Sequence, residues 1–311
     1  MKKFVYGLFT LIFLSLILIF PTQSIEGAKY GLLLWFNVII PSLLPFIIIS
    51  NIIIALNIIP YFTLFIFPIM NKIFKISKYG TYAVITGFLF GYPMGAKVTS
   101  DLRSNGLITQ NEAMYLMTFC NNVSPVFIIN YIVYQTLKKP ELACPTIGIL
   151  FASSIICGLI FKKSYVKKDI VHNTPKLNID KNKNLSFSIL DKSICSAFET
   201  IVRLGGYLII FGIISNMITL LPVSDSIKPL LTGFIEITNG INSIGISSAT
   251  FYKKYIYIII CVAFGGLSSV AQTSSFLSSV NIPVSKYFFA KIINTVISFF
   301  LTLLYLFITV H

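Results

Sequence analysis

Four short groups of polar residues lie inside long apolar stretches and hold most of the side chains capable of chemistry. The first group comprises Gly91, Tyr92, Pro93, Gly95 and Lys97. Glycine accepts unusual backbone angles and proline donates no backbone hydrogen bond, so we expect a helix to break here. A helix that starts after the break directs free N–H groups and partial positive charge into it, which favours an anion such as a carboxylate. The alternative is a kinked helix whose Lys97 extends to the cytoplasmic interface.

The second group places Asn121, Asn122 and Ser124 before Pro125, within the uncharged run Ala113–Leu137. Adjacent residues point to different faces of a helix, so the two amides cannot share one interhelical contact. Pro125 also frees a carbonyl one turn earlier. These groups suit a substrate carboxylate or a coupling cation, and the alternative is hydrogen bonding between helices.

The third and fourth groups lie in the second half of the chain. Gly265 and Gly266 open a serine-rich stretch whose candidate site residues include Ser268, Ser269 and Gln272. Such a stretch packs closely on a neighbour or lines a cavity.

Glu236 precedes Thr238, Asn239 and Gly240, and it is the only acidic residue well within a predicted membrane hairpin. An ionisable group at that depth is costly, so a functional role is the first hypothesis. Glu236 is a candidate to carry a proton, bind a cation, or pair with Lys97 or Lys291. By contrast, Glu199 and Arg203 have the spacing of a local helical ion pair.

No other constellation of residues indicates catalysis. The five cysteines lack CxxC spacing, and the two histidines lie in a basic loop and at the C-terminus. This pattern predicts no metal site, no catalytic residues and no cofactor. The chain also has no phosphate-binding loop sequence of the kind that ATP-driven transporters use. We therefore do not expect an enzyme.

The elements that position these groups must be membrane helices. Of the 311 residues, 56% are hydrophobic and 11% are charged, whereas soluble domains carry roughly a quarter charged residues. The net charge of +14 would indicate nucleic-acid binding in a soluble protein, but the charges here lie in short loops between uncharged runs. The class that fits is a multi-span membrane protein without a nucleic-acid partner. The uncharged runs are Phe4–Phe20, Tyr30–Asn71, Tyr79–Ala96, Ala113–Leu137, Leu142–Phe161, Leu204–Ser224, Tyr255–Ser285 and Ile292–His311.

The basic residues indicate how these runs cross the bilayer. Lys162–Lys192 is the longest polar segment and is expected on the cytoplasmic side, where lysine-rich loops remain. Most basic residues lie on the cytoplasmic side if Tyr79–Ala96 and Ile227–Ser248 are re-entrant hairpins, each entering and leaving the membrane on the same side. Lys253 and Lys254 then fall on the outside. Phe4–Phe20 is expected to be an uncleaved first span, with a signal peptide as the alternative. Tyr30–Asn71 is too long for one span and is expected to bend at its prolines, Pro41, Pro45, Pro60 and Pro68.

The two halves of the chain resemble each other. The segments at 87–90 and 118–124 match those at 233–236 and 263–269 with almost the same offset. The expected topology separates the two copies by an odd number of crossings, which makes them inverted repeats of the kind that build transport sites. The alternative is a helical bundle with chance similarity. The predicted fold is an all-α polytopic membrane protein with two inverted repeats, each with a re-entrant helical hairpin and a broken transmembrane helix. Its divisions are an N-terminal transmembrane helix and short external loop (1–29), a first gate repeat (30–161), a basic cytoplasmic linker (162–192) and a second gate repeat (193–311).

These motifs resemble those of the YlbJ-type sporulation integral membrane proteins, also called SpoVV, within the nucleoside-recognition (gate) domain superfamily. The matching stretches follow one another along nearly the whole chain: WFNVIIPSLLPF at 35–46, GYPMGAK at 91–97, FCNNVSPVFI at 119–128, TNGI at 238–241 and FGGLSSVAQ at 264–272. The resemblance implies an architecture like that of concentrative nucleoside transporters. It also implies movement of dipicolinate, a rigid aromatic dianion, out of the mother cell across the outer forespore membrane.

The sequence therefore predicts a multi-pass membrane transporter that moves a small organic anion by alternating access at a site lined by the four polar groups. Its partners are the anionic solute, with dipicolinate implied by the resemblance, and the lipid bilayer; a homo-oligomer is an open alternative. An ion-coupled transporter of nucleosides or other solutes is the first rival function. A structural protein of spore-envelope assembly is the second.

Overall fold

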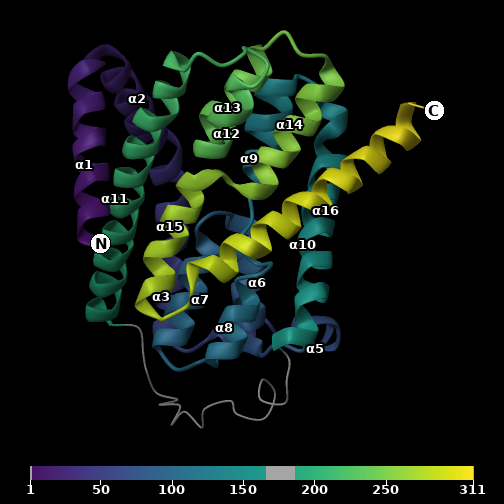
Figure 1. Ribbon diagram of the computed structural model, residues 1–311. Helices are drawn as coiled ribbons and strands as arrows, with labels where there is room; N and C mark the ends of the chain where they lie inside the picture. Colours follow the sequence, from purple (N-terminus) through teal and green to yellow (C-terminus); the bar gives the residue numbers. More distant parts are fainter. Residues whose placement is uncertain (1, 166–185, 311) are drawn as a thin grey trace.

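The computed structural model describes residues 2–165 and 186–310, and every regular element in these ranges is a helix (Figure 1). The predicted all-α class is confirmed. Five helical stretches are long and apolar enough to cross a membrane: Pro21–Ala55, Pro140–Tyr165, Phe187–Leu220, Phe251–Ser279 and Val284–Thr309. The inverted relation of the two halves and the re-entrance of the hairpins stay predictions.

The first half of the chain begins with two long helical stretches joined at Pro21. In chain order its elements are α1 (Lys2–Ile19), α2 (Pro21–Leu34), the π-helix η1 (Trp35–Ile39), α3 (Ile40–Ala55), α4 (Ile59–Phe62), α5 (Phe67–Phe74), α6 (Lys78–Phe90), α7 (Met94–Ser104), α8 (Gln110–Leu116), α9 (Pro125–Phe127), the π-helix η2 (Ile128–Leu137), the 3-10 helix η3 (Pro140–Leu142) and α10 (Ala143–Tyr165).

The second half begins with a 31-residue helix. In chain order its elements are α11 (Phe187–Met217), the 3-10 helix η4 (Ile218–Leu220), α12 (Lys228–Ile235), α13 (Ile237–Ile246), α14 (Phe251–Phe264), α15 (Gly266–Ser279) and α16 (Val284–Val310).

Two details near the N-terminus differ from the sequence-based expectation. Residues 21–29, expected as an external loop, form the first turns of α2, because Pro21 occupies a first-turn position where its missing N–H costs nothing. The helix also continues through Pro41 and Pro45, directly after the wider turn of η1. The chain first leaves the helix at 56–58, just before Pro60.

Helix α11 packs along α2 and α3 (Figure 1). The close approach depends on Gly27 and Gly31 of α2, whose spacing is typical of membrane helix contacts. A Cβ atom at Gly27 would lie 2.6 Å from the Gly212 carbonyl oxygen, and one at Gly31 would lie 2.5 Å from that of Leu208. The Trp35 indole N–H then donates to the Ile201 carbonyl at 2.7 Å. These contacts fix the start of one half against the start of the other.

The predicted basic linker lies largely outside the described residues. Of the segment 162–192, the structure describes 162–165, which end α10, and 186–192, which begin α11. Both flanking helices therefore extend further than the uncharged runs indicated, because lysine is a good helix former and its charge is tolerated at a helix end.

Two helical hairpins, α6–α7 and α12–α13, form the centre of the molecule. Their limbs contain 13, 11, 8 and 10 residues, so the longest reaches about 20 Å, against about 30 Å for a hydrocarbon core. A pair of glycines lets the limbs touch in each hairpin. A Cβ atom at Gly87 would lie 3.0 Å from the Gly95 Cα, and one at Gly240 would lie 2.0 Å from the Gly233 Cα.

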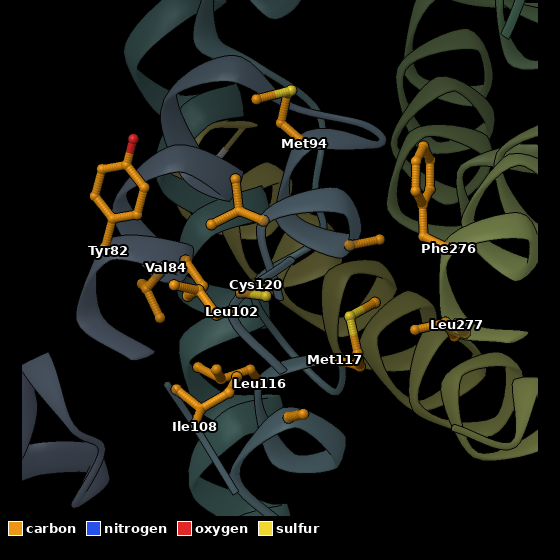
Figure 2. Packing of buried hydrophobic residues seen from close by; sticks show 14 of the residues in the cluster. Tyr82, Val84, Met94, Leu102, Ile108, Leu116, Met117, Cys120, Phe276 and Leu277 are labelled. Atoms are coloured by element: carbon orange, nitrogen blue, oxygen red, sulfur yellow. The ribbon is translucent and has the colours of Figure 1, made fainter. Parts of the chain in front are cut away.

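The hydrophobic core of the first hairpin extends into the second half of the chain. Figure 2 shows Leu102, Met117 and Cys120 on one side of this cluster and Phe276 and Leu277 of α15 on the other. The Ser100 hydroxyl of α7 donates to the Phe276 carbonyl at 3.0 Å, so α7 and α15 are joined by polar contacts as well as by apolar packing. The core thus positions the two polar helix starts described below.

Candidate functional site

Four interruptions of helical structure meet near the centre of the fold. They are the break between α6 and α7, the non-helical residues before α9, the break between α12 and α13, and the break between α14 and α15. Each break is in contact with another break, and at each of these contacts a glycine lies close to the neighbouring segment. Irregular backbone at membrane depth is tolerated only against protein or a wet cavity, so this is the part of the fold suited to hold a solute.

The first break is held against the second by two glycines. Gly91 has a φ of +81°, and a Cβ atom there would lie 2.6 Å from the Ser124 backbone nitrogen. One turn into α7, a Cβ atom at Gly95 would lie 2.4 Å from the Cys120 carbonyl oxygen. Ser124 caps α9 by accepting the Phe127 N–H at 3.3 Å, and Pro93 immediately precedes α7. The predicted break at 91–95 is therefore present, and it packs directly on the polar segment 120–124.

Asn121 and Asn122 point in different directions, as their adjacency predicted. Asn121 Nδ2 donates to Thr273 Oγ1 at 2.9 Å and to the Tyr287 hydroxyl at 3.1 Å, while its Oδ1 accepts the Ala96 N–H at 3.3 Å. It therefore connects α7 of the first half to α15 and α16 of the second.

Asn122 instead faces α10. Its Oδ1 accepts a hydrogen bond from the Ser154 hydroxyl at 3.0 Å, and its Nδ2 donates to the Phe119 carbonyl at 2.7 Å. The chain around these amides is not a kinked helix but leaves helical structure altogether, and Pro125 starts the next helix. Asn122 therefore links the non-helical segment before α9 to α10, which belongs to the same half of the chain.

The fourth break begins at Gly265, whose φ is +88°, and Gly266 follows with a φ of +75°. A Cβ atom at Gly265 would lie 2.9 Å from the Tyr92 hydroxyl oxygen, which places Tyr92 directly over the start of α15. A Cβ atom at Gly266 would lie 3.2 Å from the Ile235 carbonyl oxygen, which joins this break to the one at Glu236. Glycine is required at both positions because of the positive φ and the close approach.

The serines of α15 divide into two sets. Ser269 lies near the hydroxyl of Tyr287, together with Thr273 and Asn121. Ser268 accepts a hydrogen bond from Gln272 Nε2 at 2.9 Å within the same helix. Ser269 therefore belongs to the central polar network, whereas Gln272 is bonded locally.

Glu236 is buried, with 3% of its surface exposed, and its carboxylate caps α13 by accepting the Asn239 N–H at 2.8 Å. Thr238 also hydrogen-bonds this carboxylate, and the Thr238 carbonyl accepts the Tyr131 hydroxyl at 3.0 Å. The Asn239 amide donates to Ser215 of α11. Within residues 2–165 and 186–310, no ion pair joins Glu236 to Lys97 or Lys291.

Lys97 is buried but already neutralised. Its Nζ lies 2.5 Å from Asp101 Oδ2 and 2.7 Å from Asn51 Oδ1 of α3. Asp101 is four residues further along α7, a spacing that would have predicted this pair as it did that of Glu199 and Arg203, which is confirmed at 2.8 Å. Lys97 thus lies one turn into α7 and faces α3.

A stripe of polar residues runs along α16, and of these the sequence analysis considered only Lys291. Tyr287, Lys291, Asn294 and Ser298 recur at helical spacing and are all buried, while the opposite face exposes large apolar residues such as Phe289, Ile292 and Val296. The signal was available as a polar stripe of period 3.6 in an otherwise apolar run. Ser298 Oγ donates to Ser153 Oγ of α10 at 2.8 Å, and Lys291 Nζ lies 4.6 Å from the centre of the Tyr92 ring.

The structure thus brings together Gly91, Tyr92, Pro93, Gly95, Asn121, Ser124, Gly265, Gly266 and Ser269, and it adds Thr273, Tyr287 and Lys291. It places Lys97, Asn122, Glu236, Thr238, Asn239, Gly240, Ser268 and Gln272 in contacts at the edge of this group. We refer to the set around Tyr92, Asn121, Gly265 and Tyr287 as the central site. The helices α7 and α15 both start at the central site, so their positive ends and hydroxyl and amide donors suit a small anion.

The chain is 26% identical over 310 residues to "Sporulation integral membrane protein YlbJ" of Bacillus subtilis (strain 168), and the similarity covers 89% of this chain and 76% of that protein. No family model matches, and neither does any solved structure.

Proposed function

We propose that this chain, which is similar to a YlbJ-type sporulation integral membrane protein, is a transporter that moves a small organic anion, most specifically dipicolinate, across the outer forespore membrane. The observation that carries the proposal is the meeting of four helix breaks at a buried polar site between the two halves of the fold. Interrupted helices that meet at a midplane site are the means by which many secondary transporters bind solute and expose it to each side in turn.

Three features of the central site favour an aromatic carboxylate. Helices α7 and α15 direct their N-terminal N–H groups toward it, and those groups attract negative charge. The Tyr92 ring provides an aromatic face next to the start of α15. Asn121 contacts both halves, so motion of one half against the other would change its hydrogen bonds. A rigid aromatic dianion matches this combination of donors and ring surface.

The direct test is solute uptake by purified protein in liposomes. Terbium ions trapped inside the vesicles become luminescent when dipicolinate reaches them, so the signal reports transport. We expect uptake above that of protein-free vesicles, and a reduction of roughly tenfold for Asn121→Ala, which removes three hydrogen bonds at the centre. Asn130→Ala is the matched control because Asn130 is exposed on η2 and outside the site.

Two outcomes would favour the rival functions. Transport of nucleosides that dipicolinate does not compete with would indicate an ion-coupled nucleoside or other solute transporter. The absence of any uptake, with Asn121, Asn122 and Ser269 variants tolerated in sporulating cells and exposed-loop variants not tolerated, would indicate a structural protein of spore-envelope assembly.

A further inference from the structure

Lys291 is a buried lysine without a counter-ion among the described residues. It lies about two turns into α16, has 3% of its surface exposed, and makes no ion pair or side-chain hydrogen bond to any residue that the structure describes. The other buried lysine, Lys97, has both a carboxylate and an amide oxygen on its ammonium group. The titratable side chains beside Lys291 are the Tyr92 phenol and the thiols of Cys120 and Cys157, and none of them is a carboxylate.

Two further polar atoms near Lys291 also lack partners. The Tyr92 hydroxyl and the Asn294 side-chain oxygen are buried and make no hydrogen bond within the described residues. Tyr92 holds its ring 4.6 Å from Lys291 Nζ, and Asn294 is one turn further along the same face of α16. Buried polar groups are almost always hydrogen-bonded, so two unsatisfied atoms beside an ammonium group that has no carboxylate partner indicate a ligand that satisfies them.

The surroundings identify the chemical class of that ligand. An unpaired ammonium group inside a membrane protein is costly, and a negative charge is what compensates it. The Tyr92 hydroxyl lies directly over Gly265, so it is adjacent to the first turn of α15, whose N–H groups add partial positive charge. Lysine, tyrosine hydroxyl and helix start are all donors, and a carboxylate accepts from each of them. A water held beside the carboxylate would donate to the Asn294 oxygen.

We propose that Lys291 is the fixed counter-charge of the transported anion, with one carboxylate bound between the Lys291 ammonium group, the Tyr92 hydroxyl and the start of α15. This assignment rests on the proposed transport function and names the group that recognises the solute. The sequence analysis favoured Lys97 for this role, with Lys291 as the second candidate. Lys97 retains a structural role with Asp101 and Asn51.

The test measures dipicolinate binding to detergent-purified protein by isothermal titration calorimetry, with thermal unfolding of the ligand-free protein as a second readout. We expect Lys291→Met to weaken binding on the order of a hundredfold, because it removes the charge opposite a buried carboxylate. We also expect this variant to unfold at a higher temperature than the wild type without ligand, since an uncompensated buried charge is gone. A merely structural lysine would give the opposite thermal shift.

Tyr92→Phe keeps the test decisive if the lysine variant misfolds. The Tyr92 hydroxyl has no hydrogen-bond partner among residues 2–165 and 186–310, so its removal should leave the unfolding temperature unchanged while weakening dipicolinate binding roughly tenfold. Lys286→Met is the matched control, because Lys286 is exposed five residues nearer the start of α16, and it should bind as the wild type does.

The outcomes separate this inference from the proposed function. Weaker binding in Lys291→Met and Tyr92→Phe but not in Lys286→Met supports the assignment. Unchanged binding in both site variants, with dipicolinate transport intact, overturns the assignment and leaves the transport function in place. Absence of dipicolinate binding and of uptake in the wild type overturns both.

Discussion

Replacing Glu112 with glutamine should remove the part of the pH dependence of stability that arises from the burial of this carboxyl group. Glu112 lies on α8, outside the five candidate spans, and 1% of its surface is exposed. Its Oε1 accepts the Ser77 N–H at 2.7 Å and thereby joins the start of α8 to the start of α6. Gly80 leaves the space for this contact, since a Cβ atom there would lie 2.3 Å from Glu112 Oε1.

Burial raises the pKa of Glu112 from 4.5 to about 7, against the opposing effect of the Ser77 hydrogen bonds. Between these values the folded protein holds a proton that the unfolded chain has released, so the free energy of unfolding falls as the pH rises. At 1.36 kcal/mol per pH unit, the full loss between pH 4.5 and pH 8 is about 3 kcal/mol. The stabilisation is complete below pH 4.5 and disappears as the pH rises through about 7.

The assay is thermal unfolding of the purified protein in detergent, between pH 5 and pH 8. Other carboxyl groups titrate in both proteins, so the difference between wild type and Glu112→Gln isolates this residue. Glutamine retains an acceptor for the Ser77 N–H, so we expect the variant to lose less stability between pH 5 and pH 8 and to match or exceed the wild type at pH 8. Glu141→Gln is the control, because Glu141 is exposed on η3 and its replacement should leave the pH profile unchanged. A Glu112→Gln profile parallel to that of the wild type would refute the argument from burial.

Two further predictions concern the packing that holds the site together. Gly87→Ala should destabilise the fold by more than about 3 kcal/mol, because the added Cβ atom would lie 1.8 Å from the Cys120 carbonyl oxygen. Gly206→Ala is the control. A Cβ atom at Gly206 meets no atom within 4 Å, so this substitution should be neutral or slightly stabilising. Size-exclusion profiles and unfolding temperatures of the two variants check this, and equal stability would contradict it. Trp35→Phe should lower the free energy of unfolding by about 1 kcal/mol, because it removes the hydrogen bond to the Ile201 carbonyl that joins the two halves. Phe36→Leu is the control, because Phe36 is adjacent but exposed, and this substitution should leave the stability unchanged. An unchanged unfolding temperature for Trp35→Phe would show that this contact contributes nothing to the association of α11 with η1.

The helix breaks were predictable because their causes are local. The backbone limits of Gly91, Pro93 and Gly265 act on their own residues and the preceding turn, whatever lies around them. The same holds for the Glu199–Arg203 pair, whose partners are four residues apart on one helix. Pro41 and Pro45 lie within helical structure, whereas Pro60 and Pro68 each start a new short helix, and the proline positions alone do not reveal this difference.

The roles of the two buried lysines were not predictable in the same way. Lys97 follows a helix break and Lys291 lies in a largely apolar helix, and both are buried. What distinguishes them is the neighbour that the fold supplies: Asp101 and Asn51 for Lys97, and the Tyr92 ring for Lys291. Tyr92 and Lys291 are far apart in sequence, so no local pattern connects them.

The sequence by itself determined that this chain is a helical membrane protein with polar interruptions, because apolar length, charge placement and the backbone chemistry of glycine and proline act over a single helix or less. Only the tertiary structure decided which interruptions meet, which amide crosses between the halves, and which buried lysine has no carboxylate partner in the described part of the chain. Those properties depend on distances between α6–α7, α14–α15 and α16, and these distances are set by the packing of glycine backbones and side chains from segments far apart in the chain.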